Sequence, residues 1–191
     1  MAGSAWGETR LALRGTLLLA RGDPRGLGCF DASLGGFWRS FRAGLVCYPF
    51  YFLLLFSRVT PAQWNAAGGF RIVAIETITF VISWTAFPLI MLRVCRWFGR
   101  DDHFFGFMVI YNWCQVPQFV LFTAIVLSDA AGLVSAGVTR TAGLIAAGAV
   151  LVYEWYVAHL ALDITAAAAI LVVLIDLVLA AVLSQVSESL Y

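Results

Sequence analysis

Lysine is absent from this chain of 191 residues, and all twelve basic side chains are arginines. Charged residues of both signs make up only 12% of the sequence, and the net charge is +1. So weak a charge, without a basic run, excludes the electrostatic footprint of a nucleic-acid-binding protein. Apolar residues instead reach 62%, and the mean hydropathy is +0.89. Soluble proteins are roughly 45–50% apolar, so the composition is that of a membrane protein.

Motifs of enzymes and metal sites are also missing. The sequence contains no GxSxG, no HExxH and no glycine-rich phosphate loop. Its cysteines form no CxxC pair and predict neither a disulfide framework nor a zinc site; they are Cys29, Cys47, Cys95 and Cys114. The adjacent acids Asp101 and Asp102 are more typical of a helix start than of a magnesium site. We therefore expect no enzyme activity, no metal and no cofactor.

Five apolar segments are long enough to cross a bilayer, which takes about 20 residues. They run Phe37–Phe56, Ile72–Leu92, Phe104–Leu127, Thr141–Ala161 and Ile164–Gln185. The sequence thus predicts an all-α polytopic membrane protein with five transmembrane helices and an N-terminal interfacial amphipathic helix. We expect residues 1–30 to form a cytoplasmic segment that carries the interfacial helix, and residues 31–191 to form a single five-helix membrane domain.

The arginines are distributed unevenly between the two sides of these spans. One side receives three, Arg58, Arg71 and Arg140. The other side receives nine, which are Arg10, Arg14, Arg21, Arg25, Arg39, Arg42, Arg93, Arg96 and Arg100. The positive-inside rule places the richer side in the cytoplasm. We therefore expect a multipass membrane protein with a cytoplasmic N-terminus and a C-terminus outside.

Residues Thr9–Arg21 show the pattern of the interfacial helix. Arg10, Arg14 and Arg21 project within about 40° of one another on a helix that turns 100° per residue, and leucines cover most of the remaining surface. This basic stripe predicts a helix that lies on the inner leaflet. The alternative is a basic tail that only sets the topology.

Polar residues interrupt the third span in the stretch YNWCQVPQFV. Asn112, Gln115 and Gln118 lie there beside Pro117. By helical rise, Asn112 has the same depth as Glu154 of the fourth span, and Gln115 the same depth as Asp176 of the fifth. We therefore expect the polar face of span three to turn inward and to form hydrogen bonds with the two acids. A carboxylate at mid-membrane costs about 2.5–3.5 kcal/mol, so at least Asp176 should be protonated or strongly hydrogen-bonded.

Two interpretations of this intramembrane polar cluster stay open. Its acids could carry protons or a substrate, or they could hold helices together through interhelical hydrogen bonds. Proline lies inside three spans, at Pro49, Pro88 and Pro117, and each frees a carbonyl and predicts a kink. In the fourth and fifth spans, small residues recur four apart, which predicts a tight antiparallel hairpin.

Two further titratable residues, Glu76 and His159, are candidates for a functional role. Glu76 lies within about two turns of the end of span two, so we expect it to be solvated or paired with Arg71. His159 is a possible ligand or proton carrier, with an interfacial hydrogen-bonding role as the alternative. An acid/base pair of Glu154 and His159 in a lipid-modifying enzyme is disfavoured, because a spacing of five places them about 140° apart on a helix.

Three stretches resemble the Yip1-type membrane domain, a five-helix family with bacterial members. They are FDASLGGFWRSF before the first span, YNWCQVP in the third, and the closing YEWYVAHLALDITAAAAILVVLID. The resemblance covers residues 30–184 and implies the five-span fold and, through the bacterial members, a place in the bacterial inner membrane. The DLYGP motif of eukaryotic members is absent, so the resemblance implies no role in vesicle traffic.

Two functions compete at this point. The first is a non-enzymatic integral membrane protein that organises the membrane or serves as an accessory subunit of a larger complex, with the bilayer and a membrane protein or a second copy as partners. The second is a small transporter or proton-conducting protein that uses Asp176 and Glu154.

Overall fold

The computed structural model describes residues 5–191, and this part of the chain contains helices and no strand. The all-α prediction is confirmed. The α-helices are α1 (Ala5–Ala20), α2 (Leu34–Ser40), α3 (Arg42–Arg58), α4 (Pro61–Ala67), α5 (Gly69–Phe98), α6 (Phe104–Ala130), α7 (Ala136–Ala161) and α8 (Ala166–Ser189). Two 3-10 helices, η1 (Pro24–Cys29) and η2 (Asp101–His103), precede α2 and α6. The first four residues of the predicted cytoplasmic segment lie outside the described residues.

Five helical segments are long and apolar enough to cross a membrane, as predicted for a multipass protein. They are formed by α2 with α3, by α5, by η2 with α6, by α7 and by α8, and they contain 24 to 30 residues. At a rise of 1.5 Å per residue they extend about 36–45 Å, which exceeds a hydrocarbon core of about 30 Å. The ends of these helices therefore reach the polar interfaces.

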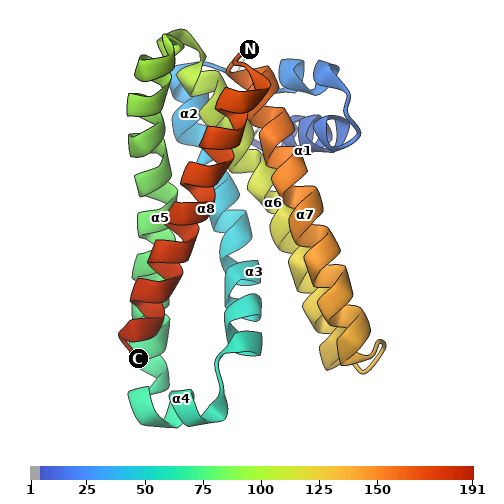
Figure 1. Cartoon of the computed structure of the whole chain (residues 1–191), viewed down its shortest axis with the longest axis vertical. Helices are drawn as coiled ribbons and strands as arrows, with labels where there is room; N and C mark the ends of the chain where they lie inside the picture. The colour runs from blue at the N-terminus through green and yellow to red at the C-terminus, as the bar shows by residue number, and fades with distance from the viewer. Residues whose placement is uncertain (1–4) are drawn as a thin grey trace.

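Figure 1 shows that α1 lies across one end of the bundle, beside α2 and the turn between α7 and α8. The segments that meet at this end contain nine of the twelve arginines. We call it the Arg-rich end. The opposite end carries α4 and Tyr191. The start of α1 and the end of α8 thus lie at opposite ends of the molecule, as an odd number of spans requires.

Helix α6 lies at the centre of the packing. It contacts α1, α2, α3 and α7, while α8 packs against α5 and α7. The predicted tight hairpin of α7 and α8 is only partly formed. Ala146 is buried, but the three small residues that follow it are exposed, and the two helices diverge away from their turn (Figure 1). The Thr165 hydroxyl caps α8 by accepting a hydrogen bond from the Ala168 amide at 3.2 Å, and the α7–α8 connection is short.

Helix α1 docks onto the bundle through a narrow face that combines small side chains with one leucine. Ala12, Thr16 and Leu19 are buried there, and a Cβ on Gly15 would lie 2.6 Å from the Phe30 ring. The arginines of the predicted stripe, Arg10, Arg14 and Arg21, are exposed on the other side. The stripe therefore faces outward, but the exposed Leu11 and Leu17 show that leucines do not form the main buried face.

Helices α3 and α5 meet largely through aromatic side chains. Tyr48 and Tyr51 of α3 have ring centroids 5.3 Å and 5.0 Å from that of Phe80 of α5. The hydroxyls of Tyr48 and Thr77 lie 3.0 Å apart, and Trp84 lies against Gly44. Rings therefore fill the space between these two helices, and we call this contact the aromatic seam.

Candidate functional site

A cavity of about 200 Å³ lies between α3, α5, α6 and α8 and is open on part of its surface. We call it the central cavity. Its wall combines aromatic rings of the seam with six side chains that carry a hydroxyl, amide or carboxyl group. These are Tyr51, Ser83, Tyr111, Asn112, Gln115 and Asp176. Most of the wall is apolar, but the volume is large enough for several water molecules beside these polar groups.

Asp176 lies on the wall of this cavity, near the middle of α8. The Tyr111 hydroxyl donates a hydrogen bond to its Oδ1 atom at 2.7 Å. The Tyr111 ring is held in place by stacking on Phe87, with ring centroids 4.2 Å apart and an interplanar angle of 25°. By helical rise, Asp176 lies about 15 Å from the start of α8, so an acid is placed within the hydrocarbon depth and beside an open cavity.

Glu154 of α7 lies behind this wall. It borders a small void of about 10 Å³ together with Tyr111 and Asp176, which is close to the space that a single water molecule needs. The neighbours of its carboxyl group include Asp176 and Gln118. The structure thus brings two acids and a tyrosine of three different helices around one void.

Gln118 is 8% exposed, and its amide nitrogen has no hydrogen-bond partner among the described residues. A buried donor without a partner is costly in an apolar surrounding. Its side chain nevertheless lies beside the Glu154 carboxyl group, so the polar face of α6 does turn toward this acid.

The predicted partner of Asn112 is wrong. Its amide nitrogen donates to the Ser40 hydroxyl at 2.8 Å rather than to Glu154. Gln115 lines the same cavity as Asp176, but the hydrogen bond to this acid comes from Tyr111 instead. Helical rise gives the depth of a residue but not the direction of its side chain around the helix axis, and Asn112 points toward the α2–α3 junction.

A second cavity, of about 160 Å³, continues the central one toward the opposite end, and we call it the opposite-end cavity. The two share wall residues, which are Tyr51, Phe80, Ser83 and Ala180. The second cavity adds Arg58, Ser184 and Ser187. A series of hydroxyl groups therefore lies between Asp176 and the opposite end of the bundle.

Glu76 is the main disagreement with the sequence-based expectation. It is 0% exposed, and it pairs with Arg58 at 3.3 Å instead of with Arg71. Tyr51 also donates to it, as does Tyr191 at 2.5 Å. Burial raises the pKa of Tyr191 further above its ordinary range, so this phenol stays a donor at neutral pH. Four residues distant in sequence meet here, which counting turns along one helix could not reveal.

The remaining candidates have structural partners. His159 Nδ1 lies 2.5 Å from the Ile164 carbonyl oxygen, and its ring stacks on Trp155. It therefore closes the α7–α8 turn. Pro49, Pro88 and Pro117 lie inside α3, α5 and α6, and Pro88 lines the central cavity. The described residues contain no group of three or more side chains suited to a metal ion.

Sequence reasoning missed three members of the site. Tyr111 opens the polar stretch of the third span but is half apolar, so no periodicity marks it as a partner of an acid. Ser40 and Tyr51 lie on α2 and α3, where their roles depend on helices far away in the sequence. Only a tertiary contact assigns them.

No family model, curated protein or solved structure matches this chain. Membership of the Yip1-like family therefore stays a prediction.

Proposed function

We propose that this is a multipass membrane protein that carries protons across the membrane by way of Asp176. The observation that supports this most is the position of Asp176, within hydrocarbon depth but on the wall of an open cavity that it shares with other polar side chains. An acid used only to join helices would be enclosed by its partners, whereas this one borders an open cavity, which in this proposal holds water.

The chemistry needs only water and the carboxyl group. A hydronium ion gives its proton to the Asp176 carboxylate, which leaves water and a neutral carboxylic acid. The acid later gives the proton to another water molecule and returns to the carboxylate. Tyr111 orients the carboxyl group through its hydrogen bond, and Glu154 can exchange protons with Asp176 across the void that both border. Intramembrane acids commonly serve as such proton relays.

The test is proton flux into liposomes that contain the purified protein and an internal pH-sensitive dye, driven by a potassium diffusion potential with valinomycin. We expect the flux to exceed that of empty liposomes and Asp176→Asn to reduce it by at least about tenfold, because proton transfer by a positioned group is worth that much or more.

Asp129→Asn is the matched control. Asp129 is an exposed acid near the end of α6 that bonds Thr139, and asparagine preserves an acceptor there. Its flux should equal that of the unmodified protein. A flux no greater than that of empty liposomes, or one that Asp176→Asn leaves unchanged, would rule out the proposal.

A second candidate function is that of an accessory subunit of a membrane complex or an organiser of the membrane. The observation that favours it is an uncovered surface on α7. A Cβ atom built on Gly143 or on Gly148 would have no other atom within 4 Å. Small residues allow another helix to approach closely. Recovery of a stoichiometric partner after gentle detergent extraction from the native membrane would support this function. Recovery of the protein alone would leave proton transport as the better proposal.

A further inference from the structure

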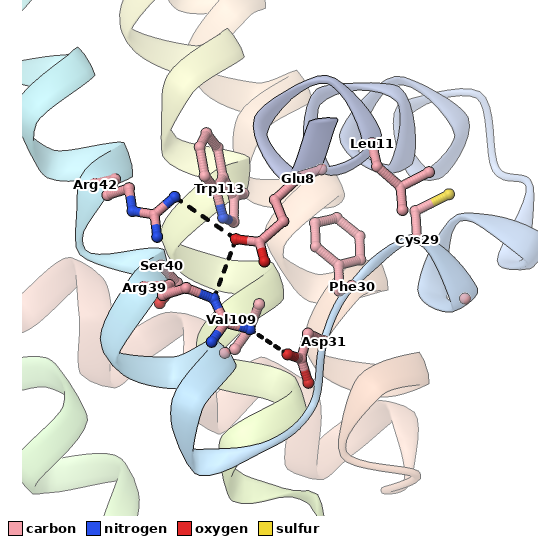
Figure 2. Close-up of a pocket in the computed structure, with 13 residues that line it drawn as sticks. Glu8, Leu11, Cys29, Phe30, Asp31, Arg39, Ser40, Arg42, Val109 and Trp113 are labelled. Carbon is pink, nitrogen blue, oxygen red and sulfur yellow. Dashed lines mark hydrogen bonds and ion pairs between the residues drawn. The ribbon is translucent and has the colours of Figure 1, made fainter. Parts of the chain in front are cut away.

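A third cavity, of about 230 Å³, opens at the Arg-rich end, and we call it the Arg-rich-end pocket. Figure 2 shows it between α1, the segment that follows η1, α2 and α6. Its polar lining consists of Glu8, Asp31, Arg39, Ser40 and Arg42. Val109 and Trp113 of α6 form part of the opposite wall.

The charges in this pocket compensate one another. Arg39 Nε lies 3.0 Å from Glu8 Oε2, and Arg39 also binds Asp31 (Figure 2). Arg42 Nη1 lies 3.6 Å from the same Glu8 oxygen. Two arginines thus face two acids, so the pocket is polar without a strong net charge. More than a third of the Arg39, Arg42 and Glu8 side chains stays exposed, so the pocket reaches solvent.

One hydrogen bond joins a side chain that lines this pocket to a side chain that lines the central cavity. Ser40 lines the Arg-rich-end pocket and Asn112 lines the central cavity. The Asn112 amide donates to the Ser40 hydroxyl at 2.8 Å, and that hydroxyl donates to the Phe37 carbonyl at 2.6 Å. Both side chains are nearly inaccessible, at 1% and 2% exposure. Each cavity therefore contributes one partner of the bond that lies between them.

We infer that the Arg-rich-end pocket is a second water-filled entrance for the same protons, and that the Ser40–Asn112 hydrogen bond is the closed gate between it and the Asp176 cavity. This inference rests on the proposed proton transport. The central and opposite-end cavities lead from Asp176 only toward Arg58 and Ser184. An entrance at the Arg-rich end would complete a proton route across the membrane. The structure then represents a state closed at the Arg-rich end and open toward the opposite end.

Cysteine accessibility tests the gate without depending on flux. Ser83 lines both the central and the opposite-end cavity, so Ser83→Cys reports water in the route. Cys29→Ser removes the one native cysteine that is not buried. A membrane-impermeant methanethiosulfonate with a quaternary ammonium group is then added to vesicles of each orientation, so that it reaches one end of the protein at a time.

In this parent protein we expect labelling of Ser83→Cys from the opposite end and little from the Arg-rich end. Adding Asn112→Ala should raise the labelling rate from the Arg-rich end by about three- to tenfold, the range that loss of one hydrogen bond allows. Ser40→Ala should have the same effect and serves if the Asn112 variant does not fold. Thr123→Ala is the control, because Thr123 is buried on the same helix with an unpartnered hydroxyl and borders none of the three cavities.

The outcomes separate the two proposals. If the parent is labelled from the opposite end and neither gate variant changes labelling from the Arg-rich end, the gate is wrong while proton transport stands. Equal labelling of the parent from both ends would also refute the gate. If the parent is labelled from neither end, the central cavity is not wet, and the proposed function fails together with the inference.

Discussion

Gly36 is packed so closely that no larger side chain fits there unless the backbone moves. It is the third residue of α2, and a Cβ built on it would lie 1.9 Å from the Asp31 carbonyl oxygen. That contact is with backbone, which cannot rotate away as the end of a side chain can. Gly36 therefore allows the segment before α2 to cross the first turn of the helix.

We predict that Gly36→Ala lowers the free energy of unfolding by about 1–3 kcal/mol, the usual cost of overpacking. The melting temperature in detergent should fall by several degrees. Gly28→Ala is the control, because nothing lies within 4 Å of an added Cβ there, and it should leave the melting temperature unchanged. Equal melting temperatures for both variants would contradict the predicted clash.

Single residues also show how far sequence reasoning reaches. It placed Asp176, Glu154 and Gln115 within the membrane because their depth follows from their position along a helix. It assigned wrong partners to Asn112 and Glu76 because the partner depends on how helices rotate about their axes. That rotation is decided by packing between segments far apart in the sequence.

At the level of elements, α2 is anchored by an acid that precedes it. Asp31 accepts a hydrogen bond from the Ser33 amide at 3.0 Å and binds Arg39 in the last turn. The hydrogen bonds from Ser33, with a smaller contribution from Arg39, hold the pKa of Asp31 below its ordinary value. A lowered folded-state pKa means that the charged carboxylate stabilises the folded state.

This contribution to stability is present above the ordinary pKa of an aspartate, about 3.9, and is lost as the pH falls through the lower folded-state value. We predict that Asp31→Asn lowers the melting temperature at pH 7 by less than about 4 °C, because the ion pair is exposed. The difference from the unmodified protein should shrink as the pH approaches 3. A difference that stays constant from pH 7 to pH 3 would show that charge is not involved.

The helices themselves were largely predictable, because apolar length and polar ends are local properties. The predicted spans fall almost wholly within the observed ones, which extend farther at most ends. The buried face of α1 was not predictable in the same way. Close packing on η1 selects small residues such as Ala12 and Gly15 there, whereas periodicity alone favours the leucines.

For the whole molecule, the arrangement of the ends leads to a prediction about topology. Nine arginines on one side and three on the other favour a cytoplasmic Arg-rich end. We predict that alkaline phosphatase fused after Tyr191 is active in a bacterial host and that a fluorescent protein fused at the same place is dark. Fusions at the N-terminus should show fluorescence and no phosphatase activity. The reverse pattern would invert the proposed orientation of the proton route.

The aromatic seam makes the contact between α3 and α5 resistant to lateral compression by the surrounding lipid. Lipid tails compress a membrane protein laterally, and interfaces of small residues respond by bringing helix backbones together. Between α3 and α5, edge-on and tilted rings bear that load instead. Because rings are stiff and cannot be compressed, they act as spacers that hold the two helices apart. The central cavity should therefore keep its volume in bilayers of different thickness and tension.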